Sequence, residues 1–446
     1  MTRHKPRLVA LSSYIGTTIE WYDFFLYGTA AAVVFNKLFF PKFDPAIGTM
    51  IAFASLGIAY LARPLGGIVI AHFGDRIGRK RMLVATLMIM GIATVLVGLL
   101  PSYQTIGIWA PILLLALRAL QGVGIGGEYG GAVLLVVEYA PRARRGIYGS
   151  ITQLGAASGL LLSAGAFSVF SSVLGDAAFL AWGWRIPFLL SVVLLAVGLF
   201  IRLTISESPA FERMKAAGRQ ARMPLASLVR HQGKATVFTI GQRLAEACVF
   251  NIYVVYVLAY ITGNLGLPRS VGVTGTLIAA GAMHVSFLAF GALSDVIGRR
   301  RVYLFGAAFS AVFAVPAFLM FNTGATVLIW LAIGIALVFG HSAMYGPLAA
   351  WWTEQFRTNV RYSGVSAAYQ VGGVLGGGFA PLIASSLIIA ADGAWWPVPM
   401  YVIAMCAISI VTGRLAEETY RQDLEERITG EKADAVAHTT TDRAAS

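Results

Sequence analysis

Four long stretches of this chain contain no Asp, Glu, Lys or Arg: residues 82–117, 146–175, 302–353 and 362–391. Each is longer than the roughly 20 apolar residues that cross a bilayer as a helix. Charged residues make up only 12% of the chain, about half the share of a soluble domain. The sequence therefore predicts an all-α membrane protein, and it excludes soluble enzymes and nucleic-acid-binding proteins.

Apolar runs between turn and charge signals predict twelve transmembrane helices in two six-helix halves. A polar, basic stretch at 205–234 is interpreted as a cytoplasmic loop between an N-terminal half (11–204) and a C-terminal half (235–414). Residues 1–10 and 415–446 are predicted to be tails, the second beginning as a short solvated helix. The predicted helices occupy residues 11–38, 50–71, 82–100, 108–138, 146–173, 184–204, 235–262, 271–293, 302–321, 325–351, 361–389 and 396–414.

Most of the 34 Lys and Arg residues fall on the side of the bundle that holds both predicted termini. Basic loops stay in the cytoplasm, so both termini are predicted to be cytoplasmic in a multi-pass protein of the inner or plasma membrane. The net charge of +13 is thus a topology signal, and no nucleic-acid partner is expected. Cys248 and Cys406 lie in apolar segments, and we expect no disulfide, metal or cofactor.

The two halves carry related motifs. GDRIGRKR at 74–81 is echoed by SDVIGRRR at 294–301, 220 positions later. Glu138 and Arg145 recur as Glu354 and Arg361, both displaced by 216 positions. Duplication of a six-helix unit explains both echoes.

These motifs resemble the major facilitator superfamily, and within it the metabolite:proton symporters, a group that includes transporters of organic acids and of proline and betaine. The resemblance implies two six-helix halves that alternate access to a central cavity, in a protein that is monomeric by family default. It rests on IEWYDFFLYG (19–28), HFGDRIGRKR (72–81), RALQGVGIGGEYGGA (118–132), WGWRIPF (182–188), ESPAF (207–211) and VRYSG (360–364).

Six ionisable residues fall inside predicted helices one, four and seven, where each costs about 2.5–3.5 kcal/mol without compensation. The resemblance implies that these helices, with the tenth, line the cavity. Arginines in such a cavity suit an anionic substrate, because a guanidinium binds a carboxylate in bidentate fashion. The predicted substrate-binding residues are Arg118, Gln121, Arg243, Tyr27, Tyr345 and Gln370. The candidate proton carriers, not ranked among themselves, are Glu20, Asp23, Glu128 and Glu246.

Purely structural interpretations stay open for these charges. Arg118 could form a permanent ion pair with Glu128 or Glu20, and Arg243 could pair with Glu246 three residues later. His341 is either a proton carrier or a packing residue.

The duplicated motif is predicted to form a cytoplasmic gate, because topology alone explains its basic residues but not the Asp that recurs in both copies. An alternative role, orientation in the membrane alone, remains open. The predicted gate residues are Asp75, Arg79, Glu138, Asp295, Arg299 and Glu354.

The predicted function is proton-coupled symport of a small organic acid, with the substrate, protons and the lipid bilayer as partners. A proline/betaine-type symporter is the main alternative, although the tail after Arg414 is too short for an extended coiled coil. Drug efflux is weaker, since residues 153–165 lack the proline expected there, and a non-transporting receptor is weaker still. No hydrolytic, redox or nucleotide-binding pattern is present, so we expect neither an enzyme nor direct use of ATP.

Overall fold

The computed structural model describes residues 6–42, 45–204 and 224–420, together with Glu212, Ala216, Gln422 and Leu424. All regular elements within these ranges are helical. The first half contains α1 (Pro6–Ala30), η1 (Ala31–Phe35), α2 (Asn36–Leu38), α3 (Pro45–Ile77), α4 (Arg79–Leu99), α5 (Tyr103–Ile106), α6 (Trp109–Tyr139), η2 (Arg142–Arg144), α7 (Arg145–Ala178), η3 (Phe179–Gly183), α8 (Arg185–Leu189) and α9 (Ser191–Thr204).

The second half repeats this order. It contains α11 (Pro224–Asn251), η4 (Ile252–Tyr256), α12 (Val257–Gly263), α13 (Arg269–Ile297), α14 (Arg299–Asn322), α15 (Thr326–Ile335), η5 (Ala336–His341), α16 (Ser342–Gln355), α17 (Arg361–Gly373), η6 (Val374–Gly378), α18 (Ala380–Ala390) and α19 (Pro397–Leu415).

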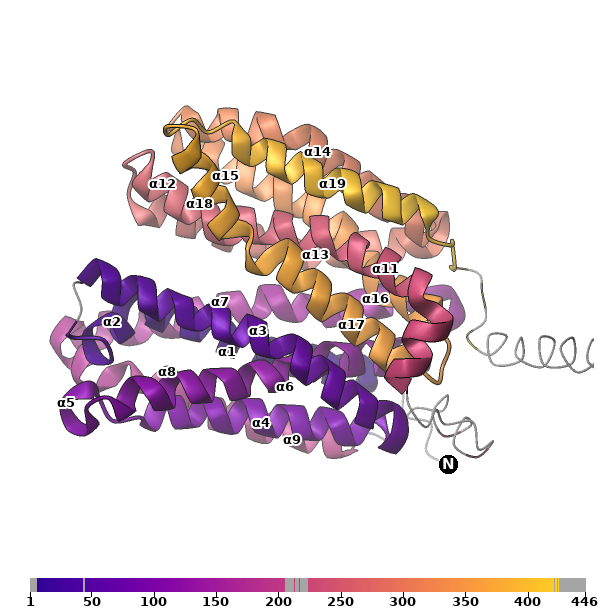
Figure 1. Ribbon diagram of the computed structural model, residues 1–446, viewed down its shortest axis with the longest axis horizontal. Coiled ribbons are helices and arrows are strands. Elements are labelled where there is room, and N and C mark those ends of the chain that lie inside the picture. The colour runs from indigo at the N-terminus through magenta and orange to yellow at the C-terminus, as the bar shows by residue number, and fades with distance from the viewer. Residues whose placement is uncertain are drawn as a thin grey trace, which may run out of the picture.

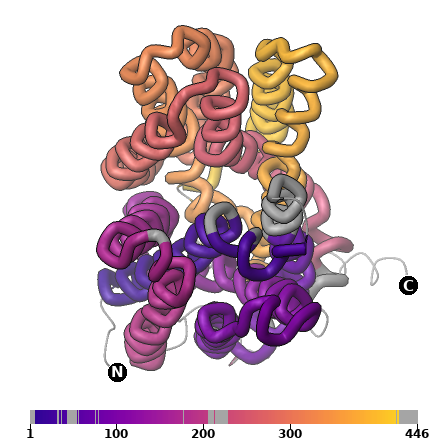
Figure 2. The backbone as a smooth tube through the Cα atoms, turned by 90° about the vertical axis from the view of Figure 1, so that its left-hand side faces the viewer, coloured from indigo at the N-terminus to yellow at the C-terminus, as the bar shows by residue number. Residues whose placement is uncertain are grey.

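Twelve membrane-crossing helices form two bundles, drawn in indigo to magenta and in pink to yellow in Figure 1. Among the described residues, ten helical stretches have the length and hydropathy to cross a bilayer. The helix through residues 6–38 and α3 complete the twelve. Figure 2, which looks along the helices, shows the two bundles side by side. The predicted two-half architecture is confirmed.

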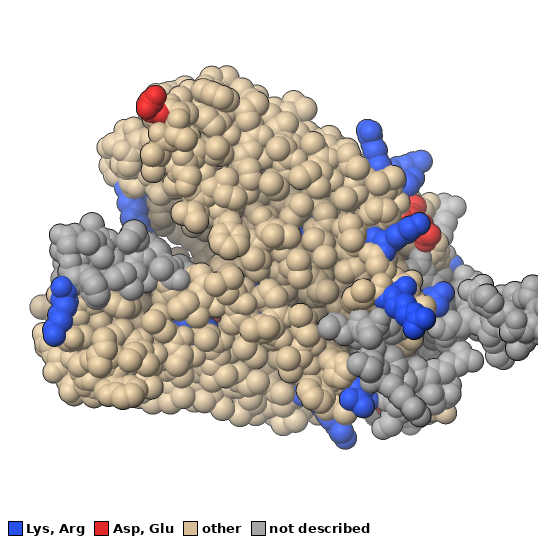
Figure 3. All heavy atoms as spheres, in the orientation of Figure 1, with Lys and Arg blue, Asp and Glu red and all other residues tan. Residues whose placement is uncertain are grey.

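Helices from both bundles meet at the interface between the halves. α7 packs against α13 and α16, while α3 packs against α17. On the face drawn in Figure 3 a broad central region is nearly free of charged side chains, and Lys and Arg gather at the right-hand end, which is the cytoplasmic one.

Two boundaries differ from the expectations. α11 begins at Pro224, inside the predicted central loop, because proline suits the first turn of a helix. A non-helical Gln232 (φ −130°, ψ 25°) separates this polar beginning from the membrane-crossing part. The remainder of the predicted loop, residues 205–223, lies outside the described residues except for Glu212 and Ala216.

The connection between helices at the duplicated motif is also shorter than the predicted loop. α3 ends at Ile77 and α4 begins at Arg79, and α13 and α14 are likewise separated by one residue. The single residues are Gly78 (φ 116°) and Gly298 (φ 104°). Only glycine adopts these angles without strain, so the motif's central glycine lets one helix turn directly into the next.

The start of the C-terminal tail is not a solvated helix, contrary to the prediction. After α19 ends, residues 416–420 are non-helical, and Thr419 is fully buried. The cause is a set of contacts to the cytoplasmic gate, described below. Residues 425–446 lie outside the described residues.

Candidate functional site: a pocket between the halves and a cytoplasmic gate

A pocket lies between the two halves and takes its walls from both. The first half contributes Trp21, Tyr60, Arg63 and Ala156. The second half contributes Arg243, Glu246, Ala247, Phe250, Asn251, His341, Tyr345, Tyr369, Gln370, Gly373 and Val374.

Wide helical turns adjoin this pocket in three membrane-crossing helices. Asn251 lies directly before the π-helical turn η4, His341 ends η5, and Val374 begins η6. Such turns insert an extra residue and redirect the side chains next to them, and they recur at functional sites. Nothing in the hydropathy pattern indicates them.

The second-half wall is built around a cluster of three polar side chains. The guanidinium of Arg243 forms an ion pair with Glu246, and Nδ1 of His341 lies 3.2 Å from Oε1 of the same carboxylate. The guanidinium also lies over the ring of Tyr369, 4.0 Å from its centroid. All three members of the cluster are more than nine-tenths buried. The structure thus forms the Arg243–Glu246 pair that was left open as a structural alternative, and His341 lies beside it.

On the opposite wall, Arg63 is a cation without an acidic partner. Its guanidinium lies 4.4 Å from the ring centroid of Tyr60 and 4.8 Å from that of Phe24. No carboxylate among the described residues is within ion-pair distance of it, and its Nε has no hydrogen-bond partner. The sequence interpretation had not assigned Arg63 to the site. An arginine inside a predicted membrane helix was the available signal.

Three predicted substrate-binding residues, Arg118, Gln121 and Tyr27, belong instead to a separate buried network outside the pocket lining. Nη1 of Arg118 donates to Oε1 of Gln121 (3.0 Å), and the guanidinium lies 4.0 Å from the ring centroid of Tyr27. Nε2 of Gln121 donates to Oγ1 of Thr94 (2.7 Å), which donates to Oδ2 of Asp23 (2.7 Å). The ion pairs of Arg118 with Glu128 or Glu20, which the structural alternative allowed, are not formed among the described residues, where Glu128 pairs with Arg202.

The four candidate proton carriers have different surroundings. Asp23 accepts a second hydrogen bond from Ser191 (2.9 Å), and Glu246 pairs with Arg243 and His341. Glu128 forms a buried ion pair with Arg202, whose Nη1 lies 3.1 Å from Oε2. Arg202 lies 74 positions from Glu128 in the sequence, and the sequence analysis did not name it as a partner.

Glu20 is the exception among the four. It is 3% exposed, and its Oε2 is buried without a hydrogen-bond partner among the described residues.

The other predicted binding residues, Tyr345 and Gln370, do line the pocket. The hydroxyls of Tyr345 and Tyr369 are 3.2 Å apart, and Tyr129 stacks on Tyr369 with 3.5 Å between ring centroids. Nε2 of Gln370 donates to the carbonyl of Gly126 in the first half (2.8 Å). The Tyr129–Tyr369 and Gln370–Gly126 contacts join the two halves beside the pocket.

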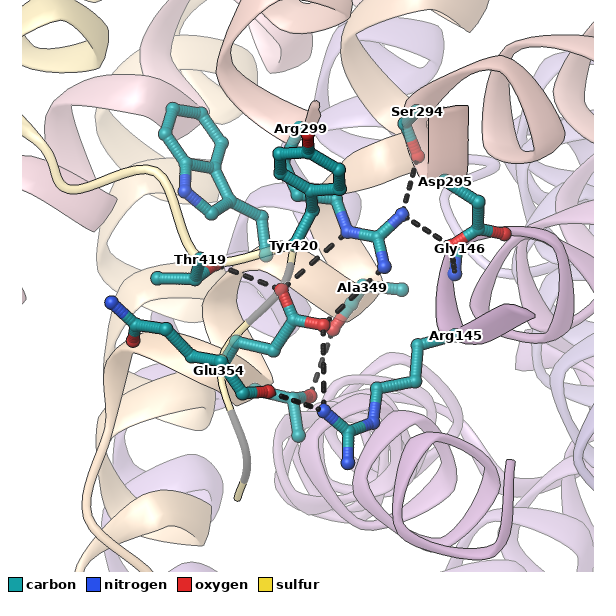
Figure 4. A network of polar contacts seen from close by, with 12 residues as sticks. Arg145, Gly146, Ser294, Asp295, Arg299, Ala349, Glu354, Thr419 and Tyr420 are labelled. Atoms are coloured by element: carbon teal, nitrogen blue, oxygen red, sulfur yellow. Dashed lines mark hydrogen bonds and ion pairs between the residues drawn. The ribbon is translucent and has the colours of Figure 1, made fainter. Parts of the chain in front are cut away.

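The cytoplasmic end is closed by contacts that cross between the halves, as Figure 4 shows for one network. Asp295 accepts hydrogen bonds from the backbone N–H groups of Gly146 (2.8 Å) and Ile147 (2.9 Å), in the first turn of α7. These N–H groups have no partner within their own helix, and the carboxylate also faces the positive end of the helix dipole. A second cross-half contact joins Arg361 to Glu138 (2.9 Å).

Within the second half, Arg299 joins the gate acids. Its Nη1 donates to Asp295 (2.6 Å) and its Nη2 lies 3.3 Å from Oε1 of Glu354. Arg145 of the first half approaches the same Glu354 oxygen at 3.9 Å. The side chains of Asp75 and Arg79, the first-half counterparts, lie outside the described residues.

The tail segment after α19 completes this network. Glu418 accepts hydrogen bonds from the backbone N–H groups of Arg299 (3.1 Å) and Arg300 (3.0 Å), which caps α14. Thr419 donates to Oε2 of Glu354 (2.8 Å), and Arg145 donates to the carbonyl of Gln422 (3.1 Å).

An Asp295→Asn variant is expected to slow net transport about tenfold while leaving substrate affinity nearly unchanged. The neutral amide loses its charge-assisted hydrogen bonds to α7 and Arg299, which weakens the cytoplasm-closed state. Initial uptake rates and equilibrium binding, measured on the same preparations, separate the two effects. Arg301→Gln, a change to an exposed cation of the same motif, serves as the matched control. Transport at the wild-type rate in Asp295→Asn would remove Asp295 from the gate.

Two six-helix halves with a pocket at their interface, joined by ion pairs and hydrogen bonds at the cytoplasmic end, are the architecture of a helical membrane transporter. Residues 9–239 match the family described as "Sugar (and other) transporter", and residues 238–435 match the "Major Facilitator Superfamily". The chain belongs to the major facilitator superfamily. It is a transporter and not an enzyme, and it is a multi-pass protein of the cell membrane.

The chain is similar over nearly its whole length to curated transporters of Escherichia coli (strain K12). It is 44% identical to the shikimate transporter, covering 94% of this chain and 96% of that protein. It is 40% identical to the inner membrane metabolite transport protein YhjE, with 93% and 95% covered. It is 33% identical to the proline/betaine transporter, with 94% and 85% covered.

Among solved structures, the proton:xylose symporter XylE bound to 6-bromo-6-deoxy-D-glucose has the same fold. The TM-score is 0.74 at 16% identity, and the match covers 96% of this chain and 99% of that one.

Proposed function

We propose that this chain is a proton-coupled symporter that takes up a small organic anion by alternating access, acting as a monomer. The observation that carries the proposal is the pair of arginines, Arg63 and Arg243, on opposite walls of one pocket. Only Arg243 has an acidic partner among the described residues. A buried cation without a counterion is costly, and a carboxylate from the substrate supplies one.

Alternating access follows from the division of the pocket walls between the two halves. Arg63 moves with the first half and Arg243 with the second, so an anion held between them draws the halves together around it. In the present conformation the cytoplasmic end is closed by Asp295 on α7 and by the Arg361–Glu138 pair. Opening requires these contacts to break, and the substrate is then released to the cytoplasm.

Glu20 is the proposed proton carrier of the four candidates. Its Oε2 is buried without a hydrogen-bond partner among the described residues, which leaves that oxygen available to a proton. An anion bound between Arg63 and Arg243 adds a negative charge to the protein interior and a proton on Glu20 removes one, so that the two binding events favour each other. This mutual preference is the requirement for symport.

A proline/betaine-type substrate is the second candidate, since the pocket contains several aromatic rings and one 33% identical relative is a proline/betaine transporter. Aromatic faces bind quaternary ammonium groups. Here, however, Arg63 already lies over Tyr60 and Arg243 over Tyr369. Two guanidiniums also repel a cationic group, which weakens this candidate and that of drug efflux.

In proteoliposomes with an inward proton gradient, we expect labelled organic acids to accumulate above their outside concentration, and an uncoupler to abolish the accumulation. Proline and betaine are measured in parallel. Accumulation of betaine alone would replace the proposed substrate class, and accumulation of an acid that resists the uncoupler would overturn proton coupling.

A further inference from the structure

Tyr369 contacts both the pocket and the opposite half. It lines the pocket from α17, and the guanidinium of Arg243 lies over its ring, 4.0 Å from the centroid. The ring of Tyr129, in α6 of the first half, stacks on Tyr369 with 3.5 Å between centroids and an interplanar angle of 12°. An aromatic ring has two faces, and at these distances two groups cannot share one face. Tyr369 is therefore held between a tyrosine of the first half and an arginine of the second.

Burial and hydrogen bonds fix the two stacked rings. Tyr129 is 1% exposed and Tyr369 is 2% exposed. Nε2 of Gln153 donates to the hydroxyl of Tyr129 (2.9 Å), and the hydroxyl of Tyr369 lies 3.2 Å from that of Tyr345. Stacked aromatic pairs and cation–π contacts both stabilise such an arrangement beyond the burial of area. The ring of Tyr369 thus has little freedom to turn away from Arg243 while the halves are packed together.

The stack lies between the pocket and a contact of the cytoplasmic gate. Glu138 and Arg361 pair across the halves near the cytoplasmic ends of α6 and α17. Tyr129 and Tyr369 lie on the same two helices, about 12–14 Å deeper at 1.5 Å per residue. Of the α17 residues that line the pocket, Tyr369 is nearest to the cytoplasmic end of the helix. An opening between α6 and α17 from the cytoplasm to the pocket must therefore separate the stacked rings.

We propose that Tyr129 and Tyr369 are positioning residues, which hold the guanidinium of Arg243 in place for the anion only while the halves are packed together on the cytoplasmic side. This inference rests on the proposed function, in which Arg243 binds the carboxylate of the substrate. Opening separates the stack and leaves Tyr369 free to turn away from Arg243, so anion binding weakens on the side where the anion leaves. Loss of a single gate contact, as in Asp295→Asn, leaves the stack in place and the affinity nearly unchanged.

The test measures the half-saturating concentration of the anion separately on each side of the membrane. Right-side-out and inside-out vesicles that contain the full-length protein exchange labelled for unlabelled anion without a proton gradient. The probes are benzoate, succinate and shikimate, which are an aromatic, a dicarboxylic and a hydroxylated acid. For a probe that the wild type exchanges, Tyr129→Leu is expected to raise the external value about fivefold. The cytoplasmic value should stay unchanged, because the stack is already separated when the pocket faces the cytoplasm.

Three controls separate the stack from other contacts. Tyr129→Phe keeps the stacked ring and loses only the hydrogen bond from Gln153, and it should behave like the wild type. Tyr362→Phe removes a different hydrogen bond between α17 and α6, from its hydroxyl to the carbonyl of Gly127 (2.6 Å), and it should leave the external value unchanged. Arg243→Lys keeps the charge but loses the planar group, and adding Tyr129→Leu to it should have little further effect.

A second variant, Tyr369→Leu, removes the other ring of the stack and should give the same one-sided loss, so the test does not depend on the folding of Tyr129→Leu alone. If both variants keep the external value of the wild type, or raise the external and cytoplasmic values by the same factor, the positioning inference is wrong while the proposed function stands. If the wild type exchanges none of the three probes and binds no other organic acid, the proposed function itself fails.

Discussion

An Arg63→Gln variant is expected to bind organic anions roughly 10- to 100-fold less tightly than the wild type. Arg63 lines the pocket, and its Nε is buried without a hydrogen-bond partner among the described residues, so the guanidinium is available to the substrate. A hydrogen bond to a charged group is worth about 1.5–3 kcal/mol, which corresponds to this loss. Equilibrium binding in detergent, with melting temperature as a folding check, gives the measurement.

Two further variants test whether the loss of binding is specific to the guanidinium of Arg63. Arg63→Lys keeps the charge but loses the planar fork, and it should lie between the wild type and Arg63→Gln. Arg118→Gln removes an arginine that lies outside the pocket lining and bonds Gln121. If Arg118→Gln weakened binding more than Arg63→Gln, the binding site would have to be moved to the Asp23 network.

Replacing Glu20 with Gln is expected to abolish proton-driven accumulation and leave exchange of substrate across the membrane intact. The amide cannot take up or release a proton, yet it fits the same space and keeps the position in α1. Uptake driven by a proton gradient should fall to the equilibrium level. Counterflow exchange, in which unlabelled substrate inside drives entry of labelled substrate, should continue near the wild-type rate.

Asp23→Asn is the comparison for this experiment. Asp23 is held by hydrogen bonds from Thr94 and Ser191, whereas one oxygen of Glu20 has no hydrogen-bond partner among the described residues. If uncoupler-sensitive accumulation survived in Glu20→Gln and disappeared in Asp23→Asn, the proton-carrier assignment would pass to Asp23.

Local and periodic patterns in the sequence predicted the membrane-crossing helices and the duplication of the six-helix half. Uncharged runs such as 302–353 can only lie in lipid or a buried core, because nothing in them could solvate a surface. The 220-residue spacing of the GDRIGRKR and SDVIGRRR motifs indicated the duplication without any knowledge of contacts. The Arg243–Glu246 pair could also be foreseen from the sequence, since residues three apart share a helix face.

Contacts between residues far apart in the sequence could not be predicted from such patterns. Glu128 pairs with Arg202, 74 positions away, and Asp295 caps a helix that begins 150 positions earlier in the chain. Sequence spacing carries no information about such pairs, because they depend on how separate helices pack. For the same reason Arg63, Trp21 and His341 lie around one pocket, while Arg118 and Tyr27 belong to a different buried network.

Composition and periodicity are properties of residues that are neighbours in the sequence. The class of protein and its twelve helices could therefore be predicted from the sequence alone. The partners of each buried charge depend on distances across the fold, and these exist only once the two halves have packed together.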